Sequence, residues 1–132
     1  MAGLVALATV ACRETVDPRA RTYPAAGAHA EITLAQLRTG ALDVANYNVE
    51  CVVRGVVYCP PCPRGAQCAP CHPNGIWVNA DTDGSAEQVF ISAHDTRQFT
   101  VGTRYLLSVS VHDPTRSVYY RWIDVLGYDV LP

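Results

Sequence analysis

From residue 47 to residue 58 the chain alternates in hydrophobicity with a period of two residues. Such a period places successive side chains on opposite faces of a β-strand. The more apolar face consists of Tyr47, Val49, Cys51, Val53, Gly55 and Val57. We therefore expect a strand over 47–58 that buries Cys51 in the core. The glycine at position 55, in the middle of this strand, predicts a bulge or a sharp bend.

Further extended segments follow the first one. The expected strands cover residues 75–80, 88–92, 104–112 and 118–128. The sequence Asp81-Thr-Asp-Gly84 is typical of a turn between two strands. Residues 93–99 show no period and leave room for about one helical turn. The pattern as a whole predicts a mainly β domain.

A short helix is expected ahead of the first strand. Thr33 is a suitable N-cap residue, and Gln36 lies three positions later, which is the spacing of a capping box. Gly40 suits the position just after a helix end. The sequence therefore predicts a helix over 34–39.

The chain begins with an uncharged apolar run that ends at Cys12. The run is too short to span a bilayer. It resembles a bacterial lipoprotein signal in which Thr9-Val10-Ala11 precede Cys12, the residue that would carry the lipid. The alternative is an ordinary N-terminal segment with an unmodified cysteine. Residues 13–30 contain prolines and no periodic pattern, so we expect a signal over 1–12, a flexible tether over 13–30 and a folded domain over 31–132.

The order of the strands and the positions of the glycines resemble an OB-fold. The segments that carry this resemblance are Val53-Arg-Gly55-Val-Val, residues 76–84, Phe99-Thr-Val-Gly102 and residues 118–125. The resemblance covers residues 47–132 and implies a five-stranded, OB-like Greek-key barrel with a short N-terminal helix. It also implies that the loop between strands 1 and 2 borders a ligand groove. Together with its N-terminus, the chain is similar to bacterial lipoproteins or secreted proteins that contain an OB-fold domain.

Four cysteines occur within thirteen residues of that loop, at Cys59, Cys62, Cys68 and Cys71. In an oxidising compartment cysteines this close form disulfides, and the sequence leaves their pairing open. The alternative is a zinc or thiol-redox site that uses the same four residues. The segment Cys68-Ala-Pro-Cys71-His72 also matches a haem-attachment motif, but the lone methionine is Met1, inside the expected signal, and the motif leaves the other two cysteines unexplained. The expected export favours two disulfides.

Composition and charge narrow the choice of partner. The 132 residues are sufficient for one compact domain, and 49% of them are hydrophobic. The formal net charge of −2 gives no general attraction to nucleic-acid phosphates, so nucleic acid is not the expected partner. OB-folds bind single strands by stacking bases on exposed aromatic rings. The residues of a possible ligand groove are Trp77, Tyr119, Tyr120 and Trp122.

The sequence carries no pattern that indicates catalysis. His94 and Asp95 are adjacent, and adjacent side chains of an extended chain point to opposite faces. We therefore expect no enzyme and no cofactor. The predicted function is an exported, non-catalytic binding or structural module of the bacterial cell envelope, either anchored to the membrane through Cys12 or free in the periplasm or outside the cell. Its partner is an unknown ligand or envelope protein; the alternatives are the zinc or thiol-redox protein and a binder of single-stranded nucleic acid or oligosaccharide in the OB groove.

Overall fold

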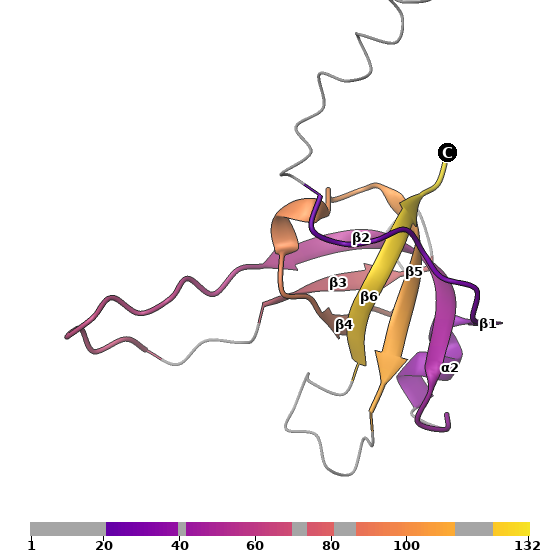
Figure 1. Ribbon diagram of the computed structural model, residues 1–132, viewed down its shortest axis with the longest axis horizontal. Helices are drawn as coiled ribbons and strands as arrows, with labels where there is room; N and C mark the ends of the chain where they lie inside the picture. The colour runs from indigo at the N-terminus through magenta and orange to yellow at the C-terminus, as the bar shows by residue number, and fades with distance from the viewer. Residues whose placement is uncertain (1–20, 40–41, 70–73, 81–86, 113–122) are drawn as a thin grey trace, which may run out of the picture.

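The computed structural model describes residues 21–39, 42–69, 74–80, 87–112 and 123–132. The described part is mainly β, with six strands and a single short α-helix (Figure 1). The elements are β1 (Ala30–Ile32), α2 (Leu34–Thr39), β2 (Asn46–Val57), β3 (Gly75–Asn79), β4 (Val89–Ser92), the 3-10 turn η2 (Thr96–Gln98), β5 (Arg104–Val111) and β6 (Ile123–Val130). None of the helices among the described residues has the length and apolar character needed to cross a membrane.

The six strands form one mixed sheet in the order β1-β2-β3-β4-β6-β5. The long strand β2 pairs with three others: β1 in parallel, β3 antiparallel and β5 antiparallel. Strand β4 meets β6 in parallel at a single residue pair, Ser92 with Asp124. Because β2 pairs with both β3 and β5, the paired strands form a cycle in the order β2, β3, β4, β6, β5.

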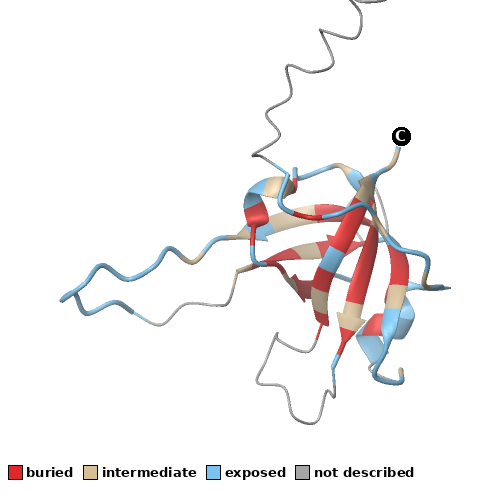
Figure 2. Cartoon of the chain, viewed as in Figure 1, coloured by how far each residue is buried: buried red, intermediate tan, exposed pale blue. Residues whose placement is uncertain are grey.

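The core lies between the inner faces of these strands (Figure 2). Alternate residues of β2 and β5 point into it, as the period-two pattern predicts. Its members from these two strands are Val49, Cys51, Val53, Tyr105, Leu107, Val109 and Val111. The expectation that Cys51 is a core residue is confirmed, since this cysteine is buried and not disulfide-bonded.

Two local predictions on this sheet and its helix are also confirmed. The pairing of β2 with β3 shifts register between Val53 and Gly55, where the sequence predicts a bulge. The helix α2 begins with the expected capping box: the backbone N–H of Gln36 donates to Oγ1 of Thr33 at 3.2 Å, and the N–H of Thr33 donates to Oε1 of Gln36 at 2.8 Å.

The structure differs from the sequence prediction in its first described residues. A tether is predicted over 13–30, but residues 21–29 lie against the sheet, and Tyr23 is only 3% exposed. The N–H of Ala26 donates to Asp129, and the N–H of Gly27 donates to Oγ of Ser108. This segment passes over β6 and then over β5 and β2 instead of pairing along one of them, so its side chains follow no strand period. We call residues 21–29 the crossing segment.

Strand β1, which continues the crossing segment, adds a sixth strand to the five that the sequence predicts. The last strand is predicted over 118–128; β6 begins at Ile123 and continues to Val130, and residues 118–122 lie outside the described part. The irregular segment 93–99 contains the short turn η2. Residues 1–20, with Cys12 and the expected signal, are also outside the described part.

Candidate functional site

The loop that joins β2 to β3 leaves the body of the protein after Val57 and returns at Gly75. Figure 1 shows its described part projecting away from the sheet. Residues 60–69 are all exposed (Figure 2). None of these residues contributes to the core, so the shape of this described part depends on contacts within the loop itself.

A disulfide joins Cys62 to Cys68 inside this loop, with their Cα atoms 5.9 Å apart. The turn between them is closed by a hydrogen bond from the N–H of Ala66 to the carbonyl of Pro63 at 3.0 Å. Gly65 is the third residue of this turn and has a φ of 81°, which a type II turn requires at that position. The predicted disulfide chemistry is thus confirmed for Cys62 and Cys68.

Cys59 lies at the base of the loop and is also disulfide-bonded. Its backbone N–H donates to Oδ1 of Asn74, which ties the outgoing chain to the returning chain. Cys71 and His72, which belong to the haem-attachment motif, are outside the described residues. The full pairing of the four loop cysteines therefore stays a prediction.

The zinc alternative requires thiolate ligands. The sulfur atoms of Cys62 and Cys68 are bonded to each other, so in this oxidised state they are not thiolates. Across the described ranges, no three His, Cys, Asp or Glu side chains are grouped closely enough to hold a metal ion.

Of the predicted groove residues, Trp77 alone falls within the described part; Tyr119, Tyr120 and Trp122 lie outside it. Trp77 is partly exposed on β3 and makes an edge-to-face contact with Phe90 of β4, with ring centroids 5.2 Å apart. Its ring lies next to Gly55, because a Cβ added at that glycine would be 3.6 Å from the Trp77 ring. The neighbours Ile76 and Val78 point into the core. Sequence reasoning missed Phe90 because its position beside Trp77 depends on the register of β3 with β4.

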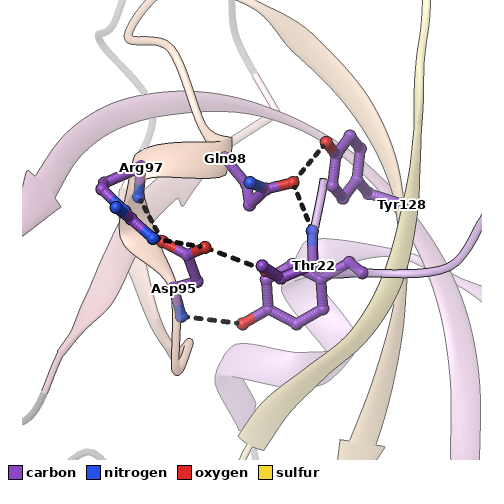
Figure 3. Close-up of polar contacts among 6 residues, drawn as sticks. Thr22, Asp95, Arg97, Gln98 and Tyr128 are labelled. Carbon is purple, nitrogen blue, oxygen red and sulfur yellow. Dashed lines mark hydrogen bonds and ion pairs between the residues drawn. The ribbon is translucent and has the colours of Figure 1, made fainter. Parts of the chain in front are cut away.

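A cluster of polar side chains lies where the crossing segment meets the chain between β4 and β5 (Figure 3). Its centre is Asp95, whose side chain is 9% exposed. The carboxylate accepts hydrogen bonds from Oγ1 of Thr22 at 2.9 Å and from Nε and Nη2 of Arg97 at 3.0 and 3.3 Å. It also caps η2 by accepting from the backbone N–H of Arg97 at 3.2 Å. Hydrogen bonds from the Arg97 side chain, and then from Thr22, hold the pKa of Asp95 below its usual value, so this carboxyl is ionised.

Thr22 is held on two sides. Its backbone N–H donates to Oε1 of Gln98 at 3.2 Å, and the same oxygen accepts from the hydroxyl of Tyr128 at 3.0 Å (Figure 3). The backbone N–H of Asp95 donates to the hydroxyl of Tyr23 at 3.4 Å. The cluster therefore joins the crossing segment to both η2 and β6.

The same residues border a cleft of about 510 Å³. Its lining residues are Thr22, Tyr58, His94, Asp95, Thr96 and Arg97. The ring of His94 lies on that of Tyr23, with centroids 4.3 Å apart, while Asp95 is engaged by Thr22 and Arg97. Sequence reasoning missed this cluster because Thr22 and Asp95 are 73 residues apart and no local pattern connects them.

Comparison of the chain with protein-family models, with curated proteins and with solved structures gives no match. A function for the chain therefore rests on its own residues: the disulfide-bonded loop, the partly exposed Trp77 beside it and the cleft around Asp95.

Proposed function

We propose that this protein is an exported, non-catalytic binding module of the bacterial cell envelope, and that its recognition element is the loop between β2 and β3. The Cys62–Cys68 disulfide carries this proposal, because it lies in a segment that is exposed and separate from the core. A cross-link there constrains the shape of the loop without helping to pack the body. A loop fixed in advance loses less conformational entropy when a partner binds.

Two independent features support export. Disulfides persist in oxidising compartments such as the periplasm and the cell surface. The apolar run before Cys12 resembles a lipoprotein signal. In this proposal Cys12 carries the lipid anchor, and the folded body begins at the crossing segment.

The proposal includes an OB-fold for the body. The cycle of paired strands β2, β3, β4, β6, β5, with its parallel contact between β4 and β6, supports a five-stranded Greek-key barrel. In such a barrel the loop after the first strand borders the ligand groove. The loop cysteines and Trp77 would then lie on the same side of the barrel as its binding surface.

Replacement of residues 59–73 by the two-residue turn Asn-Gly tests whether the loop is structural or serves recognition. Tyr58 and Asn74 would then flank a two-residue hairpin turn. We expect the free energy of unfolding in urea to stay within about 1 kcal/mol of the wild type, because the described residues among those removed, 59–69, lie outside the core and loop length changes closure entropy only slowly. A loss of about 3 kcal/mol or more would show that the loop is part of the fold and would contradict the proposal.

A photo-cross-linking residue at position 64, near the tip of the loop, tests recognition directly in the envelope of the cells that make the protein. We expect a discrete adduct with one partner from this position. The matched control is the same residue at position 101, since Val101 is also exposed but lies outside the loop. Equal adducts from both positions, or none from position 64, would contradict the loop as the recognition element.

A further inference from the structure

We infer that the cleft around Asp95 is a binding site for a small molecule that carries a carboxylate or phosphate group and a ring, with Arg97 as the residue that binds the anion. The cleft is lined by Thr22 of the crossing segment, by Tyr58 directly after β2, and by the chain around η2. This inference goes beyond the proposed function, because the site exists whether or not the loop binds a partner.

The Arg97 guanidinium is exposed and yet fixed in position. Its side chain is 81% exposed, but Nε and Nη2 are held by the buried carboxylate of Asp95. Within the described residues, Nη1 of Arg97 makes no hydrogen bond. A guanidinium offers its N–H groups as a planar fork that matches the oxygens of carboxylate and phosphate. Since Asp95 already orients this fork, an anion that binds it immobilises less side-chain freedom.

Both carboxylate oxygens of Asp95 already accept hydrogen bonds. Oδ1 accepts from the backbone N–H and Nε of Arg97, and Oδ2 accepts from Thr22 and from Nη2 of Arg97. The carboxylate therefore positions Arg97 and has its charge balanced by it. Because the Asp95–Arg97 pair is neutral as a whole, we expect modest affinity for an anion, with a dissociation constant of about 1 mM.

The other lining residues favour a ring beside the anionic group. Tyr58 lines the cleft and is 61% exposed, so its ring is accessible to a ligand. His94 is exposed as well, and its ring is placed by its contact with Tyr23, so it adds an N–H donor to the wall. The cleft volume of about 510 Å³ lies within the range of small-molecule sites.

Titration of the full chain by amide NMR tests the site with three probes: inorganic phosphate, phenyl phosphate and benzoate. We expect phenyl phosphate or benzoate to shift the amides of Asp95, Thr96 and Arg97, and whichever binds more tightly identifies the anionic group. Inorganic phosphate should bind about fivefold more weakly, since it has no ring to contact Tyr58. Equal affinity for phosphate and phenyl phosphate would overturn the part of the inference that concerns the ring.

Two variants assign the binding to Arg97. Arg97→Gln should raise the dissociation constant about tenfold or more, because a hydrogen-bonded charge is lost. Arg104→Gln is the matched control, since Arg104 is also an exposed arginine paired with a carboxylate, Glu50, at 3.3 Å, and it lies outside the cleft. Equal weakening in both variants would show only non-specific attraction. No shift from any probe up to about 50 mM would also overturn the inference.

Discussion

Replacing Tyr23 by alanine is expected to lower the free energy of unfolding by about 3 to 4 kcal/mol. The Tyr23 ring is buried among Phe99 and Tyr128, with centroids 5.8 and 6.1 Å away, and its hydroxyl accepts the N–H of Asp95. The substitution removes this aromatic contact area and leaves a cavity at the edge of the core. Urea unfolding followed by far-ultraviolet circular dichroism measures the change.

The matched control for this prediction is Tyr58→Ala. It removes the same side chain from an exposed position outside the core, so we expect a change within about 0.5 kcal/mol. A loss of less than about 1 kcal/mol in Tyr23→Ala would mean that residues 21–29 behave as a tether, in conflict with the packing of the crossing segment.

Gly127→Ala is expected to destabilise the protein by about 2 to 3 kcal/mol. A Cβ at this position of β6 would lie 2.7 Å from the carbonyl oxygen of Ala25 and 2.8 Å from that of Pro24. Both are backbone atoms of the crossing segment, and the Pro24 carbonyl accepts the N–H of Tyr128 at 3.0 Å. The added methyl group therefore forces the crossing segment away from β6. Urea unfolding measures the stability, and hydrogen exchange at Tyr128 reports the loss of its bond to Pro24.

Gly55→Ala provides the control for this change. A Cβ at Gly55 would meet Trp77 at 3.6 Å, which is ordinary van der Waals contact. Alanine at a compatible position restricts the unfolded chain, so we expect a neutral effect or a gain of about 0.5 kcal/mol. Equal free energies of unfolding for Gly127→Ala and Gly55→Ala would contradict the close approach of the crossing segment to β6.

The elements that the sequence predicts correctly are those whose signal is local. The alternation along β2 and β5 depends only on which side chains face the core, and the capping box of Thr33 and Gln36 lies within four residues. The bulge at Gly55 is similarly visible because a glycine interrupts a regular strand. The period-two alternation and the capping box therefore predict most of the secondary structure of this small domain.

The features that the sequence misses arise from contacts between distant segments. The crossing segment has no period, because its contacts change along its length: Tyr23 contacts Asp95 between β4 and β5, Ala26 contacts β6, and Gly27 contacts β5. The pairing of Thr22 with Asp95 is likewise invisible until the fold brings them together. The loop chemistry was predictable in kind, because close cysteines indicate disulfides, but the Cys62–Cys68 pairing was one of several that the spacing allows.

Cys51 is an internal control for the loop cysteines, because it is a free thiol in the same chain. It is buried, and this burial raises the pKa of its thiol to about 12. At neutral pH the folded protein therefore keeps Cys51 as an unreactive neutral thiol, and denaturation exposes it to alkylation.

Alkylation under denaturing, non-reducing conditions, with peptide mass spectrometry on protein purified from its native compartment, tests the disulfide-bonded loop most directly. We expect label on Cys51, no label on Cys59, Cys62, Cys68 or Cys71, and a cross-linked peptide that joins Cys62 to Cys68. Label on all four loop cysteines would contradict it and would favour the zinc or thiol-redox alternative.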